Sequence, residues 1–338
     1  MDHKKYALDL AARPLSIQPW ESDRLTPLEW AILRTVAYAD IFDFPLTLEE
    51  IHRYLIGIGS SLHRVEQALF IGHLVPELLI HHQNYFTLPG REHIIQTRQH
   101  RAVIAGQLWP KAVNYGRLIA SLPFVRMVAV TGALAMDNVG FDADMDFVVV
   151  TEPGRLWLCR AMVILLVRMA ALRGDRICPN LFLSENSLLY SQHDLYTAHE
   201  MIQMVPVAGF EVYQRMMLLN LWTRDYLPNA YRSKKYARES QHSYSLRKIL
   251  EIVLKAPLIN PIERWEMNRK IVKFSQQTKK GSRANFCADW CKGYLDAHEQ
   301  RVSITYAQRM RTIGEDLEQR KLIVDTSGVV SIFSGESE

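Results

Sequence analysis

Two aspartates, Asp144 and Asp146, stand directly before an apolar run that extends from Phe147 to Val150. In a β-strand, residues i and i+2 point to the same face, so the two carboxylates would lie about 7 Å apart on one side of the strand. Carboxylates this close repel, and each raises the pKa of the other unless a cation lies between them. Mg²⁺ binds one or two protein carboxylates together with substrate phosphate oxygens, and Mn²⁺ accepts the same ligands. The pair therefore indicates a divalent-metal site for a phosphate-bearing substrate.

A glycine turn lies 12 residues before the first aspartate. Here another apolar run ends at Thr131, Gly132 and Ala133. Glycine has no Cβ, so backbone N–H groups at such a turn can approach a phosphate where a helix begins. We predict that these three residues contact the phosphates of a nucleoside triphosphate whose metal ion is held by the two aspartates.

A glycine, a short helix and then Asp-x-Asp opening the next strand resemble the core of the DNA-polymerase-β-like nucleotidyltransferases. On this resemblance Gly132 falls on the family glycine, Ala135 on its usual small residue, and Asp144 and Asp146 on its metal-binding pair. The resemblance covers residues 126–184. It implies transfer of a nucleoside monophosphate from a triphosphate, with ATP expected, to a hydroxyl acceptor with Mg²⁺ or Mn²⁺ as cofactor.

The sequence departs from the family pattern at two places. Ala133 stands where serine is usual, so a hydroxyl that would contact the triphosphate is missing. The family carries a third carboxylate on the next strand, expected here over 177–184, and this chain has Asn180 near that place. An asparagine carbonyl can bind a metal, but the amide is neutral and a poor general base. Glu185 is the other third-ligand candidate. Strand alternation points it to the face opposite Asn180, so it would need a bulge to reach the metal. Further substitutes are Asp175 and Glu200, and the alternative is that no third carboxylate exists.

Three functions follow from these observations. The first is an active nucleotidyltransferase whose acceptor is a small molecule, a protein side chain or an RNA end. The second is a catalytically weakened nucleotide-binding, sensing or scaffold protein on the same fold, which Ala133 and the missing carboxylate favour. The third is a nucleic-acid-binding regulator. A purely structural alternative also exists, because an acidic turn can simply cap a buried strand.

Composition predicts a folded protein of two or three domains, since 48% of the 338 residues are hydrophobic and 22% are charged. The N-terminus has no apolar run and no small-residue cleavage site, so no secretory signal is expected. The most apolar segment, 156–172, contains Arg160 and Arg168 and is short for a bilayer, which favours a buried helix and no membrane partner. Four scattered cysteines lack zinc-ribbon spacing and are consistent with a cytoplasmic location.

The fold class expected is α+β, with a mixed-sheet nucleotidyltransferase core over 123–190. A winged-helix-like domain is predicted over 20–90, from helix starts at Thr26 and Thr47, a third helix capped by Ser60 or Ser61, and β-prone runs at 74–80 and 85–88. These first 90 residues hold 7 Lys and Arg against 11 Asp and Glu. Duplex DNA is bound through basic residues, so DNA binding by this domain is not expected.

A helical connector, kinked or divided at Pro110, is predicted over 91–122, and an α-helical C-terminal domain over 191–338. A basic block at 224–283 holds 15 Lys and Arg against 5 Asp and Glu. Its residues Lys234, Lys235 and Arg238 alternate with tyrosines, a pattern that suits RNA or another polyanion, and a solvated helix face is the alternative. Two further expectations concern a helix that buries Ile262, Trp265, Ile271 and Phe274, and a hairpin over 322–333.

Overall fold

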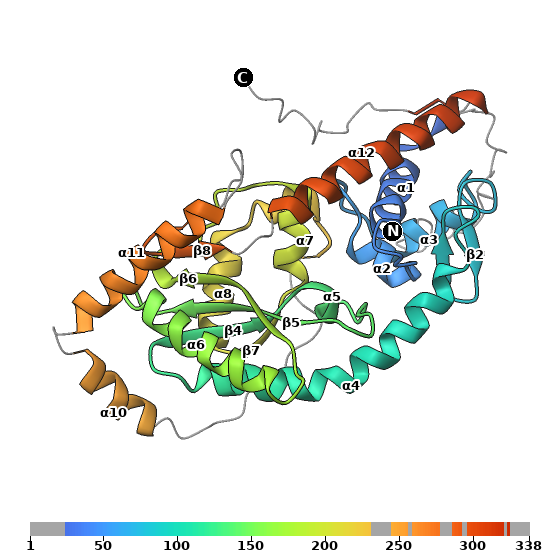
Figure 1. Ribbon diagram of the computed structural model, residues 1–338. Helices are drawn as coiled ribbons and strands as arrows, with labels where there is room; N and C mark the ends of the chain where they lie inside the picture. The colour runs from blue at the N-terminus through green and yellow to red at the C-terminus, as the bar shows by residue number, and fades with distance from the viewer. Residues whose placement is uncertain are drawn as a thin grey trace, which may run out of the picture.

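The computed structural model describes residues 24–230, 245–255, 259–277, 286–292, 296–320 and 323–324. Its centre is one mixed five-stranded sheet with the strand order β7-β4-β5-β6-β8 (Figure 1). β5 and β6 are parallel, and the other neighbours are antiparallel. The strands are β4 (Val125–Val130), β5 (Met145–Thr151), β6 (Ile177–Ser184), β7 (Val205–Ala208) and β8 (Trp290–Lys292). The α+β class with a mixed sheet is thus confirmed.

Helices cover both faces of the sheet (Figure 1). Val128 and Val130 of β4 belong to the core formed with α4 (Ile94–Ala120), α6 (Leu156–Ala171) and α11 (Ile259–Gln277). The alternate residues Met127 and Ala129 belong to the core formed with α7 (Leu195–Gln203) and α8 (Phe210–Leu219). Because both faces are buried, the central strands are continuous apolar runs rather than alternating ones. Short elements complete this part: α5 (Gly132–Ala135), the 3₁₀ helix η1 (Glu185–Ser187) and α9 (Thr223–Tyr226).

The N-terminal module contains three helices and a hairpin. They are α1 (Pro27–Asp40), α2 (Leu48–Arg53), α3 (Leu62–Phe70), β2 (Ile80–His82) and β3 (Tyr85–Thr87). Capping boxes begin α1 at Thr26 and α2 at Thr47, as predicted, and Ser61 caps α3. The β-prone run 74–80 is strand only at Ile80, because turns occupy 71–79 and Pro76 lacks the N–H that a ladder requires.

α4 joins this module to the sheet as one helix that continues through Pro110. Near its start, Arg98 forms an ion pair with Glu50 of α2 at 2.7 Å. α12 (Asp296–Gln319) returns from the sheet and packs on both α7 and α1 (Figure 1). β9 (Ile323–Val324) then pairs in parallel with β1 (Arg24–Leu25). Among the described helices, none is both long enough and apolar enough to cross a bilayer.

Two strands of the sheet come from the range predicted to be a helical C-terminal domain. One of them, β7, is an edge strand, where the missing N–H of Pro206 is tolerated. β8 lies on the opposite edge, within a segment predicted to be helical. The range 123–190 that was predicted for the core therefore omits β7 and β8, which complete the sheet. Of the expected hairpin over 322–333, only β9 is described, and 231–244 of the basic block lies outside the described residues.

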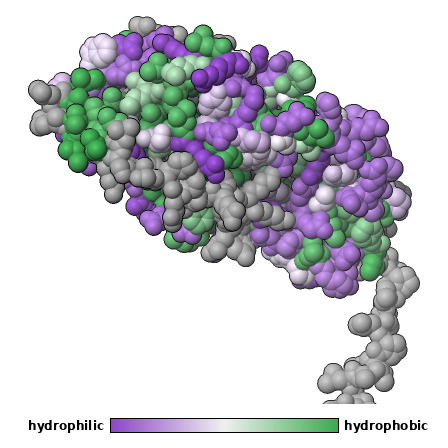
Figure 2. All heavy atoms as spheres, turned by 90° about the horizontal axis from the view of Figure 1, so that it is seen from below, coloured by the Kyte–Doolittle hydropathy of each residue, from purple (hydrophilic) through white to green (hydrophobic). Residues whose placement is uncertain are grey.

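Polar side chains attach two C-terminal helices to the sheet. Glu263 and Glu266 of α11 are buried, whereas Ile262 and Trp265 are 49% and 63% exposed, so the prediction that these two apolar residues point inward was wrong. The physical reason is a capping contact, since the Glu263 carboxylate accepts the backbone N–H groups of Trp157 and Leu158 at the start of α6. Figure 2 shows apolar residues gathered at one end of the face that it draws.

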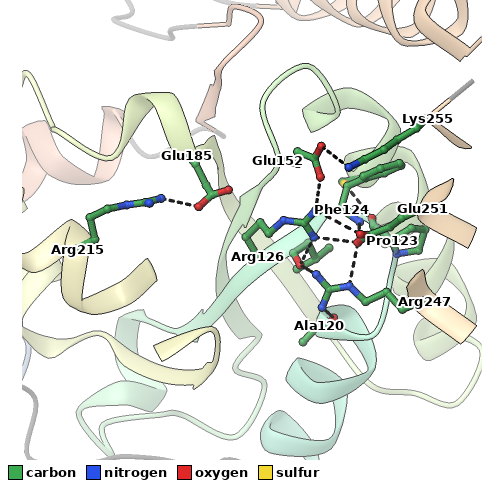
Figure 3. Close-up of polar contacts among 12 residues, drawn as sticks. Ala120, Pro123, Phe124, Arg126, Glu152, Glu185, Arg215, Arg247, Glu251 and Lys255 are labelled. Carbon is green, nitrogen blue, oxygen red and sulfur yellow. Dashed lines mark hydrogen bonds and ion pairs between the residues drawn. The ribbon is translucent and has the colours of Figure 1, made fainter. Parts of the chain in front are cut away.

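The second such helix is α10 (Ser245–Leu254), which contacts β4 through Glu251 (Figure 3). The Glu251 carboxylate accepts the Phe124 N–H at 2.8 Å, the Arg126 guanidinium at 2.8 Å and the Arg247 guanidinium at 3.0 Å. Burial opposes ionisation of Glu251, but the hydrogen bonds from Arg126, Phe124 and Arg247 outweigh it and lower its pKa to about 2. Glu251 is therefore a charged anchor for α10.

We expect Glu251→Gln to lower the free energy of unfolding by about 1–2 kcal/mol at pH 7, because Arg247 and Arg126 each lose a charged partner, although Arg126 keeps Glu152. A depressed pKa stabilises the fold above the ordinary value of 4.5, so the difference from wild type should shrink as the pH falls toward 2. Urea unfolding at several pH values measures this. Glu185→Gln is the matched control, because Glu185 pairs with the half-exposed Arg215 (Figure 3) and should change stability by at most about 0.5 kcal/mol. Equal losses would contradict the anchor.

Candidate functional site

The glycine turn and the second aspartate are packed directly against each other. The Thr131 N–H donates to the Asp146 carbonyl oxygen at 3.0 Å, which places the end of β4 beside the start of β5. Gly132 follows with φ +64°. A Cβ on Gly132 would lie 2.6 Å from Asp146 Oδ2. Only glycine fits here, because both its backbone conformation and the approach of the carboxylate exclude a side chain.

Asn180 reaches Asp146 from the neighbouring strand. β6 has one more residue than β5 between the pairs Phe147–Pro179 and Val148–Leu181, and the extra residue is Asn180. Its Nδ2 donates to Asp146 Oδ1 at 2.8 Å. β-Bulges re-aim side chains and are frequent beside functional sites. The bulge thus directs Asn180, the residue predicted at the third position, to Asp146. The Asn180 amide then holds one of the carboxylate oxygens of Asp146.

The two aspartates lie in different environments. Asp144 is exposed just before β5, while Asp146 is its second residue and is partly buried. Burial raises the pKa of Asp146 to about 6, hydrogen bonding from Asn180 lowers it, and the negative charge of Asp144 raises it further. The charge of Asp144 therefore acts on Asp146, and it is a smaller cause of the raised pKa than burial.

A cavity of about 450 Å³ opens at this point, between the sheet and the N-terminal module. Gly132, Ala133, Asp146 and Asn180 line it. Among the other predicted candidates, Asp144, Asp175, Glu185 and Thr131 do not line it. Glu185 forms an ion pair with Arg215 at 2.5 Å, and Asp175 pairs with Lys111 at 2.7 Å. Neither of these carboxylates lines the cavity, and Thr131 lies behind it, 3% exposed.

Glu200 of α7 is the additional carboxylate of this cavity. Burial raises its pKa to about 7, the charge of Asp146 raises it as well, and Lys292 lowers it. The sequence placed Glu200 among several substitutes without a preference, because it lies 54 residues after Asp146 and on a separate helix. The spacing of apolar residues predicts a helix here, but only the packing of α7 brings Glu200 to Asp146.

We expect Glu200→Gln to stabilise the protein at pH 8. A carboxyl group with a raised pKa destabilises the fold fully above about pH 7 and has no such effect below its ordinary value of 4.5. The variant should therefore gain on the order of 2 kcal/mol at pH 8 and nothing at pH 4. Thermal unfolding across this pH range measures the gain. Glu211→Gln, on the exposed start of α8, is the control and should change little at either pH. A gain that is independent of pH would contradict the assignment.

The residues present fit a metal ion that also binds its substrate. In the part of the chain that the structure describes, no three His, Cys, Asp or Glu side chains form a metal-binding group by themselves. Mg²⁺ does not require one, because it usually retains water and takes one or two carboxylates plus phosphate oxygens. Burial is the main cause of the raised pKa of Asp146, and the negative charge of Asp144 adds to it, so a cation bound beside Asp146 would favour its ionised form.

The fold and the site together define an α+β protein with a cavity, lined by two carboxyl groups, at the ends of its central strands. Comparisons with protein-family models, with curated proteins and with solved structures found no match for the chain.

Proposed function

We propose that the protein is a nucleotidyltransferase that uses Mg²⁺ or Mn²⁺ to move a nucleoside monophosphate from a triphosphate to a hydroxyl acceptor. The observation that carries this proposal is the contact between Gly132 and Asp146 inside a cavity that Asn180 and Glu200 also line. This contact agrees with the resemblance of the 126–184 segment to the DNA-polymerase-β-like nucleotidyltransferases. The neighbouring Asp144 supplies the second carboxylate of that pattern.

Each residue has a separate role in this proposal. Asp144 and Asp146 would hold the metal ion, which when bound supplies neutralisation of charge on the transferred phosphoryl group and on the leaving pyrophosphate. Asn180 donates to Asp146 Oδ1, so it fixes the orientation of that carboxylate. Gly132 and Ala133 line the cavity, and because their side chains are absent or small, their backbone leaves room for phosphate oxygens.

Glu200 is positioned to accept the proton of the acceptor hydroxyl. In the reaction, the acceptor oxygen forms a bond to the α-phosphorus, the bond from that phosphorus to pyrophosphate breaks, and the hydroxyl proton goes to the carboxylate. A base whose pKa lies near the working pH is the most effective for this transfer. Glu200 lines the same cavity as Asp146 and has a pKa raised to about 7 by burial.

The test is transfer from labelled nucleotide. The protein is incubated with Mg²⁺, fractionated cell extract and a nucleoside triphosphate labelled on the α- or the γ-phosphate. We expect the α-label in an acceptor and the γ-label in pyrophosphate. The γ-label in the acceptor would indicate phosphoryl transfer instead, and no labelled product with any of the four nucleotides would overturn the proposal.

A second candidate is a nucleotide-binding protein that does not transfer. Ala133 lines the cavity without a hydroxyl, and Asn180 occupies the place of a carboxylate. Calorimetry separates the two functions, because a sensing protein would bind the Mg²⁺–nucleotide complex and yield no labelled product. The nucleic-acid function stays a prediction, since Lys234, Lys235 and Arg238 lie outside the described residues.

A further inference from the structure

Aromatic side chains form the wall of the cavity that faces the sheet. Tyr38, Phe42 and Tyr54 come from the N-terminal module, and Tyr196 and His199 come from α7. The Tyr38 and His199 rings are stacked, with centroids 4.4 Å apart and 13° between their planes. Tyr54 packs on the same imidazole at 5.6 Å, and Phe42 packs on Tyr38 at 5.6 Å. We call the set of Tyr38, Phe42, Tyr54 and His199 the aromatic wall.

Hydrogen bonds hold the aromatic wall at a fixed place relative to the glycine turn. Asn138, which follows α5, donates to the Phe42 carbonyl at 2.9 Å, and Arg101 of α4 donates to the same carbonyl at 3.0 Å. The Tyr54 hydroxyl contacts the sulfur of Met136, directly after α5, at 3.5 Å. The wall and Gly132 are thus parts of one preformed cavity.

The aromatic wall carries no charge of its own near neutral pH. Burial lowers the pKa of His199 to about 3, so its imidazole is neutral. One ring nitrogen, Nδ1, contacts the Gln203 amide at 3.1 Å, while Nε2 has no hydrogen-bond partner among the described residues. His199 is only 6% exposed, and a polar atom buried without a partner is uncommon. These features suit a flat, uncharged ligand with hydrogen-bonding edges.

We propose that the aromatic wall binds the base of the nucleoside triphosphate, so that the N-terminal module is the part of the protein that recognises the nucleotide. This inference rests on the proposed function, which places the phosphates at Gly132 and Asp146. The cavity of about 450 Å³ has the size of a small-ligand site, and both sets of residues line it. Every nucleobase has a π-face that stacks on aromatic rings, and its edge can bond to polar groups such as the His199 imidazole.

The base also fits this wall better than the phosphates do. The carboxyl groups of Asp146 and Glu200 line the same cavity, and when ionised they repel phosphate unless a metal ion intervenes. A single molecule with a charged, metal-bound end and a flat, neutral end matches the two parts of the cavity. A nucleoside triphosphate has this chemistry.

The test compares two probes on the full chain by calorimetry in the presence of Mg²⁺. Inorganic tripolyphosphate reports on the phosphate site alone, and ATP, GTP, CTP and UTP each add a base. We expect at least one nucleotide to bind at least about tenfold more tightly than tripolyphosphate. Phe42→Leu and Tyr54→Leu should each weaken that nucleotide about tenfold and leave tripolyphosphate within about twofold. Phe70→Leu is the control, because Phe70 is an exposed aromatic residue of the same module that does not line the cavity.

Three results would overturn the inference. The first is equal affinity of tripolyphosphate and all four nucleotides, which leaves the metal site and the proposed function intact. The second is that the wall variants lose affinity for nucleotide and for tripolyphosphate alike. Tripolyphosphate binding also reports whether each variant is folded. The third is unchanged nucleotide binding with slower transfer, which would assign the wall to the acceptor. If wild type binds neither probe, the proposed function fails as well.

Discussion

Asp146→Asn is expected to reduce nucleotidyl transfer by at least about a thousandfold, because the variant loses the buried charge that would hold the metal ion. The substitution keeps the size of the side chain and leaves a carbonyl to accept the hydrogen bond from Asn180. The fold should therefore persist. Initial rates of α-label incorporation measure the loss, and calorimetry should show that binding of Mg²⁺–ATP disappears.

The same variant should also be more stable than wild type above pH 6. Burial raises the pKa of Asp146 to about 6, so the ionised carboxylate destabilises the fold above that pH and not below its ordinary value of 3.8. A higher melting temperature at pH 8 combined with lost activity distinguishes a site residue from a structural one. Asp142→Asn is the matched control, because this carboxylate lies in the loop just before β5, is 84% exposed, and should affect neither quantity. Equal loss of activity in the two variants would contradict the site.

Gly132→Ala is expected to disable the site through geometry rather than charge. The new Cβ would lie 2.6 Å from Asp146 Oδ2, and the backbone has φ +64°, which alanine adopts only with strain. We expect a loss of about 1–3 kcal/mol in the free energy of unfolding, because the carboxylate or the turn must move. Affinity for Mg²⁺–ATP should fall by at least about tenfold, since Asp146 is displaced. Urea unfolding and calorimetry measure the two effects.

Gly106→Ala supplies the control for this change. Gly106 lies inside α4 with no atom within 4 Å of the position that a Cβ would take. Alanine there should stabilise the helix by about 0.5–1 kcal/mol and leave nucleotide affinity unchanged. If Gly132→Ala behaved like Gly106→Ala in both measurements, the close packing of the turn on Asp146 would have no functional role.

Local patterns were sufficient for the elements around the site. The capping boxes at Thr26 and Thr47 predicted helix starts, because a cap and the residue three positions later satisfy each other's backbone groups. The apolar runs predicted β4, β5 and β6, since a strand buried on both faces is continuously apolar. A glycine between two such runs predicted the turn that the structure places against Asp146.

Other features had no local signal. β7 contains a proline that is typical of a helix end, and only its edge position makes a strand possible. α10 and α11 bury charged residues and expose apolar ones, because Glu251 and Glu263 bond to backbone N–H groups elsewhere in the chain. An apolar pattern cannot reveal such a partner, so the inward face predicted for Ile262 and Trp265 was wrong.

The sequence by itself determined the chemistry that is available, namely two aspartates at the start of one strand, a glycine turn and a neutral asparagine in the third position. These residues are close in sequence or lie on adjoining strands, although the contact of Asn180 with Asp146 also needs the bulge in β6. The tertiary structure decided which further groups share their cavity. Glu200 and the aromatic wall come from a later helix and from an earlier module. Their approach depends on how α7 and α1 pack around the strand ends, which no short-range pattern specifies.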